Sequence, residues 1–267
     1  MYQKFFDPLT LWQFNNFSSL IGIVHYVSGT EGGVSDNGTL NLSYKTGDDL
    51  KNVETNRNLV ASSLGISSVK LILPEQTHST NVKLVTNSTS TEELTNTDAV
   101  ITNVPCICIS VLSADCVPIL LYDPVKRAVG AVHAGWRGTV SKLLEKTIQQ
   151  MKASFNTQSS DLIIGIGPSI SPHIYEVGEE VIAAATRAFP DSDGIIIPSD
   201  KPGKAFFNLW EANKRQALNS GVLTEHIEIA ELCTYTNSDK FFSARKVKNQ
   251  QGRFAAGIMI KEAVETD

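Results

Sequence analysis

The stretch from Ser110 to Thr139 constrains the fold of this 267-residue chain more than any other. Two apolar runs, 117–122 and 127–132, flank the dipeptide Asp123-Pro124. This dipeptide starts turns, because proline presets φ and aspartate can bond back to the backbone. The pattern therefore predicts a hairpin, or two strands that are close neighbours.

The two ends of this expected hairpin carry residues with reactive side chains. Cys116 stands just before the first apolar run, and His133 stands just after the second, so a hairpin would bring them to one edge. His78, with Gln76 beside it, also lies where an expected strand ends. Thiolate and neutral imidazole have lone pairs that bind metals or act as nucleophile and base. Both chemistries stay open, because the chain has no C-x-x-C, H-x-H or H-E-x-x-H spacing.

Composition limits the class of protein. With 42% hydrophobic and 19% charged residues, the chain is ordinary globular material. A net charge of −5 without a long basic run argues against nucleic acid or a membrane surface as partner and favours a small polar substrate. No apolar run typical of a signal peptide or a transmembrane segment is seen. The four cysteines are irregularly spaced, so reduced thiols and a cytoplasmic location are expected.

Elsewhere, expected strands and helices alternate irregularly. Strands are expected at 21–27, 69–73, 82–85, 98–104, 106–112, 162–166, 227–232, 241–244 and 254–260. Helices are expected near 53–64, from 135 to 151, at 181–189 and at 206–218, with loops over 28–39 and 190–203. No repeat or low-complexity linker interrupts the chain. The sequence therefore predicts one compact α+β unit over residues 1–267, with mixed sheets flanked by helices.

Six motifs, in this order, resemble the YfiH family: E-Q-T-H-S, T-D-A-V-I-T, S-A-D-C-V-P-I-L-L-Y-D-P, V-G-A-V-H-A-G-W-R-G-T, I-G-I-G-P-S-I and Y-E-V-G-E-E-V. The family is also called the laccase-domain or multicopper polyphenol oxidoreductase family, and many members are described as purine nucleoside phosphorylases. The resemblance runs from about Gly32 to Ile260, and A-D-C with H-A-G-W-R-G is highly specific. It implies a layered α/β/β/α domain and a zinc ion bound by His78, Cys116 and His133.

The resemblance also implies an activity, which is phosphorolysis of adenosine, inosine, guanosine and methylthioadenosine together with deamination of adenosine. Two imidazoles and one thiolate leave one position of a tetrahedral zinc ion open, as in catalytic sites, and zinc activates water for attack on a nucleobase. Phosphorolysis also needs a held phosphate. Arg137 and the helix start at 135–139 are expected to hold it, although the glycines there also fit a plain tight turn. Gln76 and Arg245 are candidates for substrate contact, and Arg253 is a further cation of interest.

Two positions depart from the family's pattern. Thr30 stands where the family usually has an arginine, two residues before G-G-V-S, so no anion contact is expected from that loop. His173 lies in a proline-rich loop where the family has a cysteine-containing run, and we expect it to be a surface imidazole.

Other functions remain as alternatives. A copper polyphenol oxidase with several coppers needs more imidazoles than the five present, and Met151 and Met259 fall on apolar faces expected in the core, not beside a single copper. A hydrolase that edits peptidoglycan precursors, with Cys116 as nucleophile and His133 as base, would need no metal. A binding module without catalysis is the last alternative.

Overall fold

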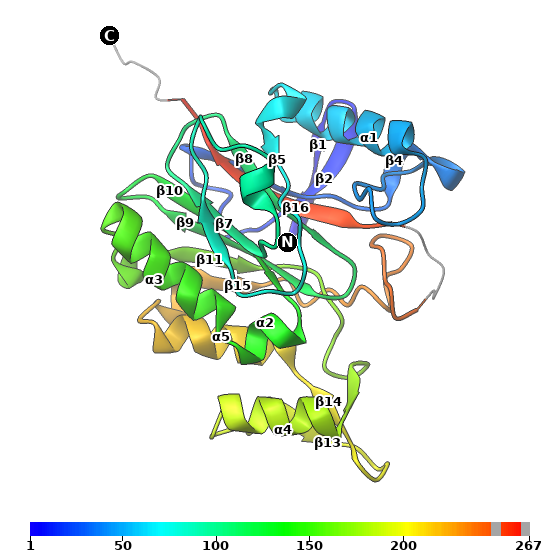
Figure 1. Ribbon diagram of the computed structural model, residues 1–267, viewed down its shortest axis with the longest axis vertical. Helices are drawn as coiled ribbons and strands as arrows, with labels where there is room; N and C mark the ends of the chain where they lie inside the picture. The colour runs from blue at the N-terminus through cyan, green and yellow to red at the C-terminus, as the bar shows by residue number, and fades with distance from the viewer. Residues whose placement is uncertain (247–251, 263–267) are drawn as a thin grey trace.

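The computed structural model describes residues 1–246 and 252–262. Two six-stranded sheets pack face to face, and helices cover their outer faces (Figure 1). Helix α1 (Leu50–Ser63) covers the first sheet, whereas α3 (Leu143–Phe155) and α5 (Leu209–Asn219) cover the second. The expected α+β class with layered mixed sheets is therefore confirmed.

The first sheet is antiparallel except at one edge, where β5 runs parallel to β8. Its strands, in spatial order, are β1 (Tyr2–Phe6), β2 (Leu9–Gln13), β3 (Ile23–Val27), β16 (Phe254–Ile260), β8 (Cys108–Ser113) and β5 (Leu71–Ile72). The final strand of the chain thus lies in the middle of the sheet, between β3 and β8.

The second sheet is also mixed, and it contains the predicted hairpin. Its strands, in spatial order, are β15 (Ile227–Ile229), β11 (Ile163–Ile166), β9 (Val117–Asp123), β10 (Ala128–Ala134), β7 (Ala99–Thr102) and β6 (Val82–Leu84). Every residue of β9 and β10 is buried, because one face meets the first sheet and the other meets helices. Their continuous apolar runs reflect this burial on both faces.

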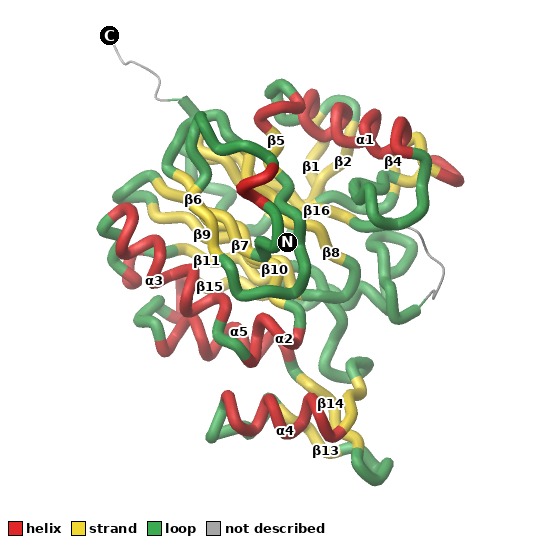
Figure 2. Tube along the Cα trace, viewed as in Figure 1, coloured by secondary structure: helices red, strands yellow, loops and turns green. Residues whose placement is uncertain are grey.

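A small third unit projects from the layered body and lies at the bottom of Figure 2. It consists of β12 (Glu176–Gly178), β14 (Lys204–Phe207) and β13 (Ile196–Pro198), with α4 (Glu179–Ala188) packed against them. Strand β4 (Glu31–Ser35) lies apart from the three sheets and packs on α1.

The buried apolar side chains follow the layers. One cluster fills the space between the two large sheets, with Ile109 and Phe254 from the first and Leu120 from the second. A second cluster joins the second sheet to its helices, and it includes Ile148 of α3. A third lies beneath α1 and includes Val60. Met151 and Met259 are buried in the second and third clusters, as expected from their apolar surroundings.

Several expected elements differ in the structure. The helix expected from 135 to 151 is divided into α2 (Trp136–Val140) and α3, because Lys142 adopts a left-handed conformation with φ 63°. The loop expected over 28–39 contains β4. The helix expected at 206–218 begins later, where the Asn208 side chain accepts a hydrogen bond from the Glu211 N–H.

Segment 241–244 is not a strand, although Phe241 and Phe242 are buried. Strands β1, β2, β12, β13 and β14 were not expected from the sequence. Among the described residues, no helix has both the length and the apolar character that a membrane crossing requires.

Candidate metal centre

The predicted hairpin brings Cys116 and His133 together. Strands β9 and β10 are antiparallel neighbours in which His133 pairs with Pro118. At the far end, Asp123 Oδ1 accepts hydrogen bonds from the backbone N–H groups of Val125 and Lys126, which closes the turn as expected. Cys116 lies in the short connection from β8 to β9, and His133 lies near the end of β10.

His78 completes a group of three possible ligands. It lies in the connection from β5 to β6 and adopts a left-handed backbone conformation with φ 61°. Its Nε2 is 3.8 Å from Cys116 Sγ, and its ring centroid is 5.0 Å from that of His133. The donor atoms of the three residues all lie within 4.8 Å of one another. Two ligands of a tetrahedral zinc ion, one sulfur and one nitrogen, stand about 3.6 Å apart, so this group fits zinc.

Asp98 holds two of these residues in place. Its buried carboxylate accepts a hydrogen bond from His133 Nδ1 at 2.8 Å and another from the His78 backbone N–H at 3.1 Å. It also accepts hydrogen bonds from Thr77 and Ser79, so residues 77–79 are all bonded to one carboxylate. The contact at Nδ1 leaves Nε2 of His133 free for a metal. A carboxylate that orients a ligating histidine in this way is common in metal sites.

The electrostatics favour a charged thiolate and imidazolium in the absence of a metal. Burial opposes the charge on Cys116, but the charge of His133 and hydrogen bonds from both histidines lower the pKa of this thiol to about 6. Burial also opposes the charge on His133, but the Cys116 thiolate and Asp98 raise the pKa of this imidazole to about 9. The pKa of Asp98 falls to about 2, since the contacts with His133 and Ser79 outweigh its burial. The surroundings of Cys116 therefore stabilise its thiolate form.

Gly135 gives the site its space. A β-carbon at this position would stand 3.0 Å from Cys116 Sγ and 3.0 Å from His78 Cδ2. Its φ of −69° is ordinary for any residue, so the close approach of these side chains, and not the backbone conformation, favours a glycine here. Gly135 lies at the turn from β10 to α2, and its packing against Cys116 and His78 is a further reason for a glycine there.

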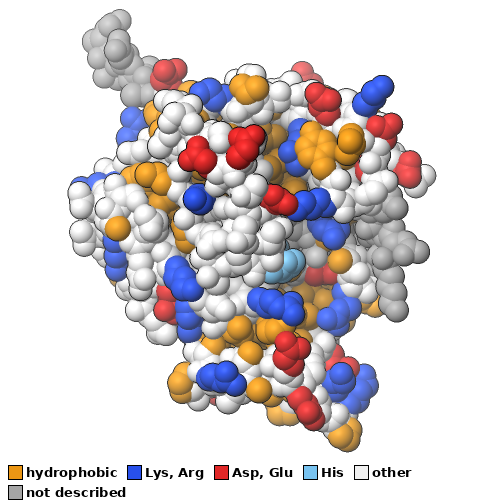
Figure 3. Space-filling view, viewed as in Figure 1, with side chains coloured by type: hydrophobic (Ala, Val, Ile, Leu, Met, Phe, Trp, Pro, Cys, Tyr) orange, Lys and Arg blue, Asp and Glu red, His pale blue; other side chains and the backbone are white. Residues whose placement is uncertain are grey.

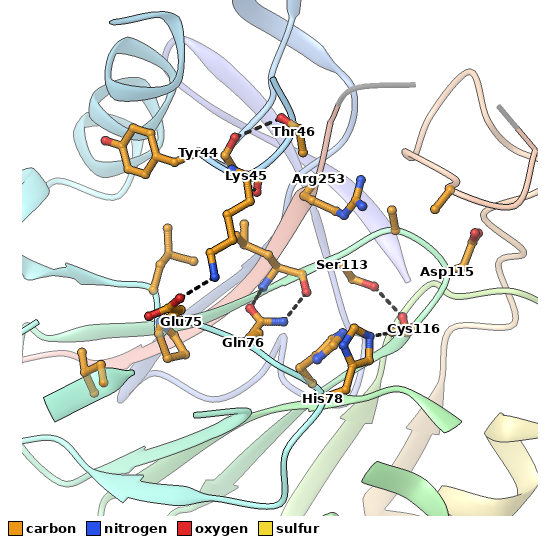
Figure 4. Close-up of a pocket in the computed structure, with 18 of the residues that line it drawn as sticks. Tyr44, Lys45, Thr46, Glu75, Gln76, His78, Ser113, Asp115, Cys116 and Arg253 are labelled. Carbon is orange, nitrogen blue, oxygen red and sulfur yellow. Dashed lines mark hydrogen bonds and ion pairs between the residues drawn. The ribbon is translucent and has the colours of Figure 1, made fainter. Parts of the chain in front are cut away.

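The three possible ligands line a cavity of about 830 Å³. Figure 3 shows that a histidine reaches the surface near the middle of one face, with lysine and arginine side chains around it. In the close-up, His78 and Cys116 lie below Arg253 and Ser113, and the loop that carries Lys45 forms the opposite side (Figure 4). The cavity volume is typical of small-molecule sites.

The candidate substrate residues differ in their placement. Gln76 lines the cavity, but its amide exchanges two hydrogen bonds with the backbone of Leu112, so it fastens the connection to β8. Arg245 lines the cavity, with its guanidinium carbon 5.2 Å from the centroid of the Tyr175 ring. Arg137 is exposed, lies over the Trp136 ring at 4.3 Å, and is not among the lining residues.

The positions that depart from the family pattern lie away from the cavity. Thr30 is buried and donates a hydrogen bond to the backbone oxygen of Asp239, so it serves the packing of two loops. His173 is exposed, as expected. His25 is buried and accepts a hydrogen bond from the Phe14 N–H.

Sequence reasoning missed four residues of this site, namely Asp98, Arg57, Tyr175 and Lys45. Asp98 stands in the motif T-D-A-V-I-T, which drew attention only as part of a resemblance. An aspartate at the start of an apolar run was the available signal. The other three stand in segments whose place beside the cavity depends on tertiary packing.

Comparisons with known proteins place this geometry in a family. The sequence profile of the family described as multi-copper polyphenol oxidoreductase laccase matches residues 24–261. The chain belongs to this laccase family. Its relatives include a protein of Bacteroides thetaiotaomicron named purine nucleoside phosphorylase, which is 38% identical over 256 residues, covering 92% of this chain and 95% of the relative.

Two further relatives of the laccase family extend the comparison. A protein of an unknown prokaryotic organism, named adenosine deaminase RL5, is 33% identical over 229 residues, covering 83% of this chain and 87% of the relative. The crystal structure of the hypothetical protein YfiH of Bacillus licheniformis superimposes with a TM-score of 0.85 at 28% identity. That match covers 90% of this chain and 93% of the other, so the two chains share the fold over nearly their whole length.

The family's description as multi-copper finds little support in the donor residues. Of the five histidines, only His78 and His133 take part in a group of three or more possible metal ligands among residues 1–246 and 252–262. A site with several coppers needs many more imidazoles than these two.

Proposed function

We propose that this protein is a zinc-dependent purine nucleoside phosphorylase that also deaminates adenosine. The proposal rests on one observation, which is that a His–Cys–His group suited to zinc lines a cavity of about 830 Å³. The relatives named purine nucleoside phosphorylase and adenosine deaminase indicate the substrates. We assign adenosine, inosine, guanosine and methylthioadenosine, with phosphate as the second substrate. A nucleoside and a phosphate fit a cavity of this size together.

The residues around the group have distinct roles in this proposal. His78, Cys116 and His133 would hold the metal, and zinc when bound supplies Lewis-acid chemistry next to the substrate. Asp98 orients His133 through Nδ1 and keeps the connection around His78 in place. Because the three possible ligands line the cavity, a substrate bound there would lie beside the metal.

Tyr175 and Arg245 would form the wall that contacts the nucleoside. Burial raises the pKa of Tyr175 to about 12, so its hydroxyl stays protonated at neutral pH and can donate a hydrogen bond. Phe207 stacks against the Tyr175 ring, with centroids 6.3 Å apart, and Arg245 covers the ring as well. Such packing fixes the position of the hydroxyl.

Phosphorolysis requires no group beyond the two substrates. An oxygen of hydrogen phosphate forms a bond to C1′ of the sugar, while the bond from C1′ to N9 breaks and its electron pair passes to the purine. The proton that hydrogen phosphate gives up ends on the purine, so the products are the free base and ribose 1-phosphate. Holding both substrates in line supplies much of the rate enhancement for such a step.

Product analysis by chromatography tests the proposal. Zinc-loaded protein is incubated with adenosine or inosine, with and without phosphate. We expect adenine or hypoxanthine only when phosphate is present, and inosine from adenosine in either case. Cys116→Ala should lose both activities, whereas Cys106→Ala, a thiol outside the cavity, should keep them. Absence of all these products at high enzyme concentration would exclude the purine function.

The charged Cys116–His133 pair supports a second candidate, a hydrolase that cleaves amide bonds of cell-wall precursors without a metal. A thiol with a pKa near 6 beside an imidazolium is a competent nucleophile at neutral pH. The two candidates respond differently to metal removal. Activity that survives complete chelation and disappears after alkylation of Cys116 would favour the hydrolase.

A further inference from the structure

Two half-buried arginines of the cavity have no acidic partner in the part of the chain that the structure describes. Arg57, from α1, and Arg253, just before β16, are both half-buried and line the cavity. Within residues 1–246 and 252–262, neither guanidinium is in an ion pair with a carboxylate. Two further cations line the cavity: Lys45 is paired with Glu75 at 2.6 Å, and Arg245 is exposed. Burying an unpaired charge is costly, so the two arginines indicate a missing anion.

The same short segment holds both arginines. Arg57 Nε donates a hydrogen bond to the Leu42 backbone oxygen at 2.9 Å, and the Leu42 N–H donates one to the Arg253 backbone oxygen at 3.1 Å. The Arg253 N–H in turn donates to Asn41 Oδ1 at 3.0 Å. The two side chains therefore extend from neighbouring points of one hydrogen-bonded framework. This arrangement restricts their positions before any ligand binds.

Each guanidinium has N–H donors that no described residue accepts from. Arg57 uses Nε for Leu42, and its guanidinium carbon lies 4.1 Å from the centroid of the Tyr44 ring. Among the described residues, the Arg253 guanidinium donates only through Nη1, to the Gly252 backbone oxygen at 2.6 Å. Burial lowers the pKa of both arginines, but a guanidinium stays charged at neutral pH. The remaining N–H groups suit bidentate contacts with a tetrahedral oxyanion.

Arg253 also lies toward the candidate metal centre. In Figure 4 its guanidinium occupies the space between the loop of Lys45 and the turn of Ser113 and Cys116. Arg253 lines the same cavity as Asp115 and Cys116. The Asp115 carboxylate itself is committed to hydrogen bonds from Thr234 and Ser243 and from the Arg245 backbone N–H. An anion bound by Arg253 would therefore lie next to a substrate at the metal centre.

We propose that Arg57 and Arg253 form the phosphate subsite of the cavity and hold inorganic phosphate for attack on the nucleoside. This inference rests on the proposed phosphorylase function. It replaces the expected phosphate site at Arg137, whose guanidinium is exposed and packs on Trp136. Helix α2, which contains Arg137, has only five residues, so its N-terminus gives little support for a phosphate site there.

Steady-state kinetics of the zinc-loaded full chain tests the subsite. We expect Arg57→Gln and Arg253→Gln each to raise the KM for phosphate about 10- to 100-fold, as for loss of a hydrogen-bonded charged group. The KM for inosine should change by less than about twofold, because the substitutions remove contacts with phosphate and not with the nucleoside. Arg57→Lys keeps the charge and should lie between wild type and Arg57→Gln. Arg187→Gln, on the exposed side of α4, serves as the control.

Direct binding separates the subsite from the activity. Inorganic phosphate is titrated into zinc-loaded protein without nucleoside and followed by phosphorus NMR. Arginine-dependent binding without turnover would support the subsite and overturn the phosphorylase function. Equal phosphate binding by wild type and both glutamine variants would overturn the subsite even if turnover occurs. The subsite would also be overturned if Arg137→Gln, and neither Arg57→Gln nor Arg253→Gln, raised the KM for phosphate.

A parallel titration with a nucleotide shows whether the subsite binds free phosphate or a phosphate attached to the nucleoside. Inosine 5′-monophosphate is titrated in parallel, and we expect it to compete with inorganic phosphate. If the nucleotide alone binds in an arginine-dependent manner, the subsite recognises a phosphate attached to the substrate. That result would overturn the assignment to inorganic phosphate.

Discussion

Gly135 lies so close to Cys116 that a β-carbon on the glycine would stand 3.0 Å from the sulfur. Real β-carbons rarely tolerate such a contact, so Gly135→Ala should push the thiol out of register with the two histidines. We expect the variant to fold but to bind less zinc, measured as metal content after dialysis. Gly138→Ala, whose β-carbon would meet the Leu143 side chain at 3.3 Å, is the control. Full zinc content in Gly135→Ala would show that the ligand set is placed elsewhere.

Asp98→Asn should weaken metal binding without removing a ligand. The amide would present donors to His133 and the backbone N–H groups that now donate to the carboxylate. Loss of such a supporting contact typically costs about 10- to 100-fold in metal affinity. Competition with a fluorescent chelator measures this loss. Asp123→Asn, a buried carboxylate at the other end of the hairpin, should leave zinc affinity unchanged. Equal affinities in wild type and Asp98→Asn would contradict the assigned role.

Zinc binding should release protons in a pH-dependent number. Between pH 6 and pH 9 the metal-free protein holds Cys116 as thiolate and His133 as imidazolium, because their pKa values are about 6 and about 9. A metal requires both groups deprotonated, so this pair should release about one proton per zinc at pH 8 and more as the pH falls below 6. Calorimetry in buffers of different ionisation enthalpy counts these protons. Absence of proton release at pH 8 would contradict this charge state of Cys116 and His133.

Acid should destabilise the fold through His25. Burial, with a further contribution from Lys4, lowers the pKa of His25 to about 3, so it stays neutral in the folded state. In the unfolded chain it gains a proton below about pH 6.5. The unfolded state then binds more protons, and stability should fall by up to about 1.4 kcal/mol per pH unit as the pH drops from 6.5.

His25→Gln provides the matched variant. Its side-chain oxygen can still accept the hydrogen bond from the Phe14 N–H, but it cannot titrate. Urea unfolding between pH 7 and pH 4 should show a shallower loss of stability than in wild type. Identical slopes would mean that His25 does not control this dependence.

Local patterns predicted the central part of the fold. The hairpin of β9 and β10 follows from two apolar runs and a turn dipeptide, and its register brings Cys116 and His133 to one edge. The third ligand, His78, was assigned from the family resemblance, because its distance from the others depends on how the two sheets pack. Residue patterns alone left a metal site and a nucleophilic pair equally open.

Elements that depend on tertiary packing escaped sequence reasoning. The helix break at Lys142 was missed because the apolar positions of α2 and α3 fit one helical period. Strand β1 was missed because its central residues are exposed, with no apolar alternation to detect. The apolar segment 241–244 resembled a strand, yet its phenylalanines reach the core from a loop. The role of Asp98 was missed because its five donors belong to His133 and to residues 77–79, which tertiary packing brings to it.

The site lies where the chain crosses twice between the two large sheets. Cys116 lies on the crossing from β8 to β9, and His78 lies on the crossing from β5 to β6. A metal ion bound by both would act as a cross-link between these crossings, in addition to any role in catalysis. Its binding free energy would then be added to the free energy of unfolding. Removing the metal with a chelator would therefore lower the free energy of unfolding and weaken the connection between the two sheets.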